Sequence, residues 1–168
     1  MYRKEDITIQ VIPTQEYFRI IRKELENNGQ AYVRVTGNSM MPLLHHMRDR
    51  VEIKPGVKVR LGDIVLYDRQ NGRYALHRVV RKKKDSFTMV GDNQWYIDDN
   101  LAYDQIVGVV TAVERNGKRI ARGNGFLKLY SLILTTTAFP RIYLRKAILK
   151  LLKPFRQSGN QGQEGAYE

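Results

Sequence analysis

The sequence of 168 residues contains no cysteine. A chain without cysteine has no disulfide framework, no thiolate nucleophile and no cysteine-ligated metal. His45 and His46 lie side by side, but no third ligand stands at a spacing typical of a metal site. We therefore interpret these two histidines as loop residues, and the sequence predicts neither a bound metal nor another cofactor.

A long apolar run is also missing. The longest stretch, 126–139, contains Lys128 and ends before Pro140. It is about 14 residues long, whereas a membrane-spanning helix needs about 20 apolar residues. The first residues are charged and no apolar segment follows them, unlike a secretory signal. The sequence thus predicts no spanning helix and no leader, while its 42% hydrophobic content suits one domain with a real core.

Acidic residues are scarce, above all in the last third of the chain. The whole sequence has 29 Lys and Arg against 17 Asp and Glu, a net charge of +12. Residues 113–156 hold eleven basic residues and one acid, so this segment alone carries +10. A charge of this size predicts an anionic partner, which is a nucleic acid, an acidic lipid or an acidic protein.

Short alternating segments separated by turns fill the middle of the chain. Residues 14–27 predict a helix whose apolar stripe includes Ile21 and Leu25 and which Asn28 and Gly29 end. The segments with strand patterns are 31–35, 50–54, 63–67, 74–80, 86–90, 106–113 and 118–121. Short strands at this spacing predict a mostly β (α+β) domain with a curled, barrel-like antiparallel sheet.

The composition divides the chain into four parts. These are an N-terminal arm and helix (1–30), a β-rich domain (31–125), an apolar and basic helical tail (126–157) and a disordered tail (158–168). Within the third part, 141–156 is an amphipathic helix with lysines opposite an apolar face of Leu144, Ile148, Leu151, Leu152 and Phe155. This helix either lies on an anionic membrane surface or packs its apolar face on the β core.

Three residue types needed for nucleophilic catalysis follow one another along the β-rich domain. Ser39 lies in a turn after Gly37 and Asn38, and His77 interrupts an apolar strand. A serine hydroxyl needs a neighbouring base to take its proton, and a neutral histidine suits that role. Three aspartates in one loop offer a carboxylate to orient the histidine: Asp92, Asp98 and Asp99. Taken alone, a serine in such a turn is more often a structural turn residue and such a histidine more often a hydrogen-bonded core or edge residue, and the aspartates fit ordinary turns.

Five short motifs that contain these residues occur in a characteristic order. They are Gly37-Asn-Ser-Met-Met-Pro42, Gly62-Asp-Ile-Val65, His77-Arg-Val79, Gly91-Asp-Asn93 and Asp98-Asp99. In this order and spacing the chain resembles the signal peptidase I family, whose relatives include the LexA-type self-cleaving repressors. The resemblance covers residues 32–112.

The resemblance implies a role for each matched residue. Ser39 matches the nucleophile, and His77 stands where most bacterial members have a lysine base, as in the endoplasmic-reticulum and archaeal-type branch. Asp98 or Asp99 completes such a site, and Asp92 is a second supporting carboxylate. Because Gly37 replaces a serine that some members use, the oxyanion would be held by backbone N–H groups. The substrate would pair with the strand and turn formed by Tyr32, Val33, Arg34, Val35, Gly37, Asn38 and Met40.

The expected function is a serine endopeptidase that removes a leader or pro-segment from a peptide or protein precursor. Residues 1–38 predict a helix in water rather than the membrane anchor of signal peptidases, so we expect a cytoplasmic relative. Residues 141–156 would hold it peripherally at the inner face of the membrane. Two alternatives stay open, a LexA-like nucleic-acid-linked regulator and a catalytically silent peptide-binding module. A nucleic-acid partner is not expected, because residues 1–31 supply one helix, too little for a helix-turn-helix domain.

Overall fold

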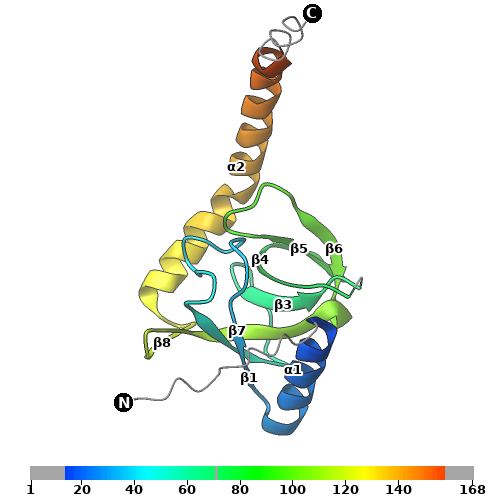
Figure 1. Cartoon of the computed structure of the whole chain (residues 1–168), viewed down its shortest axis with the longest axis vertical. Helices are drawn as coiled ribbons and strands as arrows, with labels where there is room; N and C mark the ends of the chain where they lie inside the picture. The colour runs from blue at the N-terminus through cyan, green and yellow to red at the C-terminus, as the bar shows by residue number, and fades with distance from the viewer. Residues whose placement is uncertain (1–13, 71, 158–168) are drawn as a thin grey trace, which may run out of the picture.

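The computed structural model describes residues 14–70 and 72–157, which form one antiparallel sheet and two long helices (Figure 1). The predicted arm and tail, 1–13 and 158–168, lie outside the described residues. A helix, α1 (Thr14–Asn28), precedes the sheet, and a second helix, α2 (Gly125–Gln157), follows it. The strands are β1 (Ala31–Arg34), β2 (Arg50–Lys54), β3 (Ile64–Asp68), β4 (Tyr74–Lys82), β5 (Ser86–Val90), β6 (Asp98–Ala102), β7 (Ile106–Arg115) and β8 (Lys118–Ala121).

The sheet has the order β1-β2-β7-β3-β4-β5-β6, with β8 paired to β7. The mostly β prediction is confirmed, and the described sheet is open, since β1 and β6 form its two ends. Register shifts occur in four of the strand pairs, including β2 with β7 and β5 with β6. Such irregularities bend a sheet. The strands therefore curl as the sequence predicts, but the end strands β1 and β6 do not pair with each other, so the sheet stays open.

The strand β6 is absent from the sequence prediction, which places its first residues in a loop. Asp98, Asp99 and Asn100 have low strand propensity and read as turn residues. They form a strand because β5 pairs with them, with Met89 opposite Asp98 and Phe87 opposite Leu101. Tertiary pairing at the end of the sheet therefore overrides the local preference.

The helix α1 packs its apolar stripe on the sheet. Ile21 and Leu25 are buried in the main core cluster, together with Val33, Val51 and Ile53 from β1 and β2. Gly29 ends the helix with φ of 65°, and its N–H donates to the Leu25 carbonyl at 3.0 Å. The sequence prediction of this helix and its end is confirmed.

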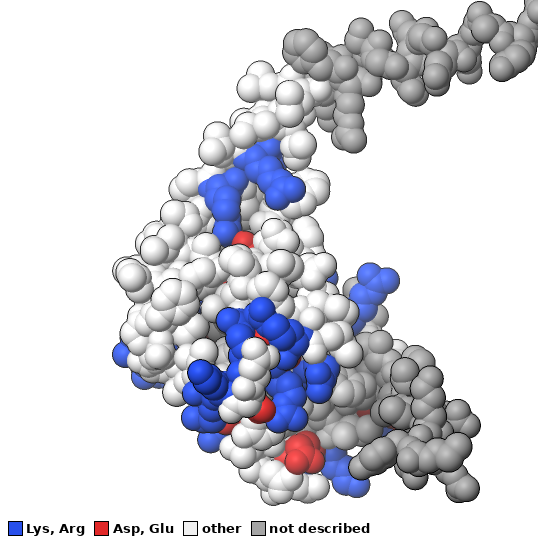
Figure 2. Space-filling model, turned by 60° about the vertical axis from the view of Figure 1, so that its left-hand side comes forward, with Lys and Arg blue, Asp and Glu red and all other residues white. Residues whose placement is uncertain are grey.

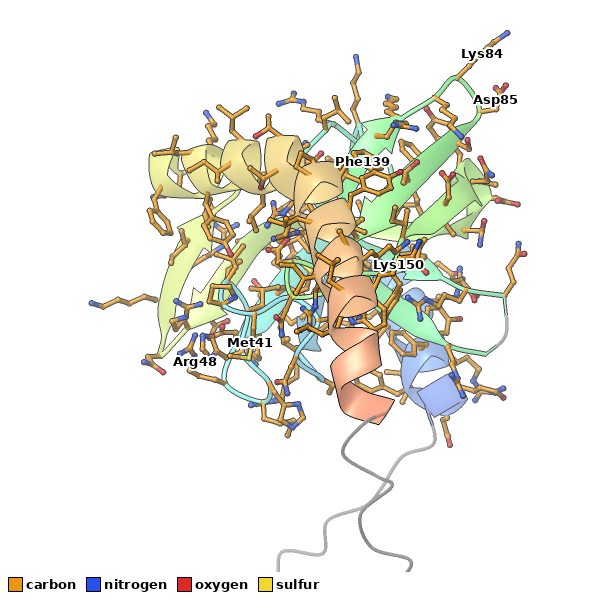
Figure 3. All side chains as sticks on the ribbon, turned by 90° about the horizontal axis from the view of Figure 1, so that it is seen from above. Met41, Arg48, Lys84, Asp85, Phe139 and Lys150 are labelled. Carbon is orange, nitrogen blue, oxygen red and sulfur yellow. The ribbon has the colours of Figure 1, made fainter. Side chains whose placement is uncertain are left out.

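The helix α2 has two halves that differ in their surroundings. Asn124 caps its start, and Ala138 and Ile142 are buried against Val80 and Val90 of the sheet. The helix bends near Phe139, and the half that carries Lys150 extends beyond the sheet (Figures 1 and 3). Pro140 follows directly and lacks the N–H that would continue the helical bonds, a common cause of such a bend.

Among residues 14–70 and 72–157, no helix combines the length and apolar composition that crossing a membrane requires.

Candidate active site

Ser39 lies in the turn that leaves β1, and the segment after β5 fixes its position. The backbone N–H of Asn93 donates to the Ser39 carbonyl oxygen at 2.8 Å. A side chain at Gly91 would place its Cβ 2.7 Å from the same oxygen, so only glycine permits this approach. The Gly91-Asp-Asn93 motif is therefore a support for the serine turn.

His77 is 1% exposed on β4, and it contacts a carboxylate. Its Nδ1 lies 2.8 Å from Oδ2 of Asp98 and 2.9 Å from the hydroxyl of Tyr67. The Tyr67 hydroxyl also donates to Asp98 Oδ2 at 2.5 Å, and Arg69 Nη2 donates to the same oxygen at 2.7 Å. Asp98 Oδ2 thus accepts from three donors, which belong to β3, to the residue directly after β3 and to β4.

This network decides which ring nitrogen of His77 is free. An ionised carboxylate only accepts hydrogen bonds, so the Nδ1 atom beside Asp98 carries the proton of the neutral ring. The Nε2 atom then keeps its lone pair and can accept a proton. This is the tautomer that a general base needs.

Asp98 is held in its ionised form. Burial by itself would raise the pKa of Asp98, but the hydrogen bonds from His77, Tyr67 and Arg69 outweigh it and lower the pKa to about 2. At neutral pH the carboxylate is therefore charged and can stabilise a protonated imidazole. Burial beside this charge also raises the pKa of Tyr67, so its hydroxyl stays a donor.

Ser39 and His77 share one pocket of about 190 Å³. The turn brings the serine and β4 brings the histidine, while α1 and the start of β4 contribute Phe18 and Tyr74, whose rings stack at 3.8 Å. Because His77 is otherwise buried, this pocket is its route to a substrate.

Asp99 and Asp92, the other two predicted carboxylates, have different partners. Asp99 accepts from the Thr88 hydroxyl at 2.6 Å and lies 3.7 Å from the ammonium of Lys83. Asp92 accepts two hydrogen bonds from Arg78, both of 2.7 Å. The structure thus brings Asp98 to His77, whereas Asp99 contacts Thr88 and Asp92 pairs with Arg78.

The ion pair of Asp92 with Arg78 connects the serine turn to α2. Both side chains are 1% exposed. Arg78 Nη1 also donates to the Gly62 carbonyl at 2.7 Å and to the Ser131 hydroxyl of α2 at 2.5 Å. Asp92 belongs to the segment that fixes Ser39. By pairing with Asp92, Arg78 therefore holds this segment in place without contacting the pocket itself.

We expect Arg78→Met to destabilise the fold by about 3–5 kcal/mol, because it leaves the Asp92 carboxylate buried without its partner. Denaturant unfolding measures this loss. The double variant Arg78→Met/Asp92→Leu should recover much of it, since both buried charges are then removed. A loss of stability in Arg78→Met that the double variant does not reduce would contradict the argument.

The seven predicted substrate-binding residues divide into two groups. Val33, Arg34, Val35 and Met40 line the pocket with Ser39. The others have local partners: Tyr32 donates to Glu52, Gly37 N–H donates to the His46 ring at 2.9 Å, and the Asn38 carbonyl accepts from Met41 and Asn93. Within the described sheet β1 pairs only with β2, so its outer side is open to an extended peptide.

Several residues around the site were missed in the sequence. Arg69, directly after the end of β3, follows Tyr67 by two residues, the spacing of side chains on one face of an extended chain. Tyr96 lies with its ring centre 6.4 Å from that of His77. The two-residue spacing was a usable signal, whereas nothing local marks Tyr96. Over the part of the chain that is described, no cluster of His, Asp and Glu is arranged as metal ligands.

An open antiparallel sheet that brings a serine and a histidine–carboxylate pair to one pocket is typical of a serine peptidase or of a relative that keeps the same site. The model of the Peptidase S24-like family matches residues 4–111, and the chain belongs to this family. The match places it in the superfamily of LexA and the signal peptidases. A comparison with curated proteins finds no match.

Proposed function

We propose that this protein is a serine endopeptidase in which Ser39 is the nucleophile, His77 the general base and Asp98 the orienting carboxylate. His77 Nε2 takes the hydroxyl proton as Ser39 Oγ attacks a peptide carbonyl carbon. The protonated His77 gives this proton to the leaving amine, and an acyl-enzyme forms. Water then attacks the ester with His77 again as base, which releases the acid product and restores Ser39.

The hydrogen bond between His77 and Asp98, at the pocket that also holds Ser39, carries this proposal. A buried histidine needs a hydrogen-bond partner in any role. The proposal is supported by the combination of a carboxylate on Nδ1 and a pocket that the ring shares with Ser39. The family supports peptidase chemistry at a coarser level, since it includes self-cleaving regulators as well as peptidases.

We further propose that the substrate is a peptide or protein precursor that lies extended along β1. The open side of this strand offers backbone groups for one more antiparallel strand. The pocket of about 190 Å³ is smaller than the roughly 300–1,000 Å³ of typical ligand pockets. We therefore expect a small side chain next to the cleaved bond.

Incubation of the purified protein with a diverse peptide library, read by mass spectrometry, tests the activity. Cuts at a defined sequence with a small residue beside the broken bond would support the proposal. Peptides that bind at the β1 side and stay intact would instead identify a silent peptide-binding module.

The outer half of α2 supports a peripheral membrane location, which we also propose. Its exposed apolar side chains include Leu144, Ile148 and Leu151, of which Leu151 is 72% exposed. Basic residues lie on the same half, and Figure 2 shows Lys and Arg side chains along it. Since Ile142 faces the sheet, the apolar side chains that follow it on another side of the helix have no core to pack on. An anionic bilayer at the inner face of the membrane would bury these apolar side chains and attract the basic side chains.

We expect the protein to float with vesicles that contain anionic lipid and to stay behind with neutral vesicles. Lys146→Gln/Lys150→Gln should weaken binding by about 2 kcal/mol, or roughly 30-fold, at about 1 kcal/mol per cation. Leu144→Glu/Ile148→Glu should abolish it, whereas Ile20→Glu, a change at an exposed apolar residue of α1, should have no effect. Failure of the unmutated protein to float would reject the membrane location.

A further inference from the structure

A cavity of about 570 Å³ lies between the first half of α2 and the sheet. The strands β3 and β7 supply one wall, and α2 supplies the other. Its volume falls in the range of small-molecule sites. None of its lining residues belongs to the pocket of Ser39 and His77, so it is a separate site.

The walls of this cavity are apolar. The sheet side consists of Ile64, Val110 and Val113, and α2 contributes Leu127 and Leu132. The helix lies close because Gly62 has no side chain: a Cβ there would stand 3.3 Å from that of Ser131. A cavity with such walls favours a flexible hydrocarbon chain over a polar molecule.

One polar atom in the wall lacks a partner. The hydroxyl oxygen of Thr135 is fully buried and has no hydrogen-bond partner among the described residues. Thr136 and Thr137, the next residues of α2, both donate their hydroxyls to carbonyls of the preceding turn. A buried hydroxyl without a partner costs free energy, so Thr135 is a position where an apolar side chain can replace threonine without loss of a hydrogen bond.

The mouth of the cavity is basic. Arg60, Arg122 and Lys128 line it against a single acid, Asp63. Asp63 accepts from Arg122 at 2.7 and 2.5 Å, so Arg122 is neutralised, while Arg60 and Lys128 are exposed. Figure 2 shows basic side chains clustered on this part of the surface, over the start of α2 and β8. The uncompensated charge is complementary to an anionic head group.

We propose that this cavity binds the acyl chain of an anionic single-chain amphiphile, with its acidic head at Arg60 and Lys128. The chain lies between α2 and β7, and the head stays at the surface. This site is independent of the proposed peptidase activity, because it requires neither Ser39 nor His77.

Calorimetric titration of the full chain with laurate, below its micelle concentration, tests the proposal. We expect saturable binding with one laurate per chain, and binding at least about tenfold weaker for dodecyl maltoside, which has the same chain and a neutral head. Thr135→Met should fill the cavity with a flexible side chain and weaken laurate binding at least about tenfold. Its melting temperature should rise, because the unpaired hydroxyl is gone, and this separates lost binding from unfolding.

Two matched variants complete the experiment. Thr137→Met makes the same change on the exposed side of α2, and Lys118→Glu reverses an exposed charge on β8; both should bind laurate as the unmutated protein does. Lys128→Glu should weaken laurate binding and leave that of dodecyl maltoside unchanged. The absence of saturable binding, or an equal effect of Thr135→Met and Thr137→Met, would overturn the proposed site. Equal affinity for laurate and dodecyl maltoside would overturn the role of the basic mouth.

Discussion

Replacement of His77 by alanine is expected to lower the rate of peptide cleavage by about 10⁴- to 10⁶-fold, the loss seen when a serine peptidase loses its general base. The physical reason is that the Ser39 hydroxyl is a weak nucleophile unless Nε2 takes its proton. Initial rates on a peptide selected from the library measure this change. His77→Gln keeps most of the buried volume and should be equally inactive.

The control for this prediction is His45→Ala. His45 lies in the same loop as Ser39, and its side chain belongs to no part of the proposed network. It should retain nearly full activity. Turnover by both His77 variants, with melting temperatures near that of the unmutated protein, would remove His77 from the mechanism.

Asp98→Asn is expected to reduce kcat by about 10⁴-fold with little change in KM. Asparagine has nearly the shape of aspartate, but its amide cannot stabilise the protonated ring of His77. It can also hold the ring in the wrong tautomer, with the proton on Nε2 facing Ser39. Steady-state kinetics measure the separate effects on kcat and KM.

Asp99→Asn is the matched control, since it makes the same chemical change at the adjacent residue. Asp99 bonds Thr88 and lies near Lys83 at the edge of the sheet. We expect its activity to stay within a few-fold of that of the unmutated protein. The reverse order of effects, with Asp99→Asn inactive and Asp98→Asn active, would mean that the register of β6 is wrong.

The choice between these two aspartates illustrates what the sequence could not predict. Asp98 and Asp99 are chemically identical, and adjacent residues of a strand point to opposite faces. Their roles depend on the pairing of β6 with β5, which sets Asp98 opposite Met89. That pairing is a tertiary contact in which one partner, the start of β6, has weak strand propensity, so no local pattern contains it.

Ser39 and His77 were predictable because short motifs mark both residues in the sequence. Arg78 and Asp92 also belong to the motifs, His77-Arg-Val79 and Gly91-Asp-Asn93. The sequence does not show that these two residues form a buried ion pair next to the serine turn. Motif positions alone do not separate residues that perform the chemistry from residues that hold the loops. The distances in the structure show which carboxylate contacts His77, namely Asp98, and which pairs with Arg78, namely Asp92.

The surroundings of the C-terminal helix could not be predicted from the sequence either. Periodicity correctly predicted a basic amphipathic segment, but it left open whether the apolar face packs on the core. Ala138 and Ile142 are buried against the sheet, whereas Leu144 and Leu151 are exposed and do not pack on the core. The membrane interpretation stays a proposal. The bend near Phe139, seen in Figure 3, separates the two halves of the helix.

A side-by-side comparison of the unmutated protein and Ser39→Ala in one peptide library tests the central claim most directly. The account predicts cuts at defined bonds with the unmutated protein and none with Ser39→Ala, whose melting temperature should be almost unchanged. Identical cuts in both samples would contradict it, because the hydroxyl of Ser39 would then have no part in the reaction.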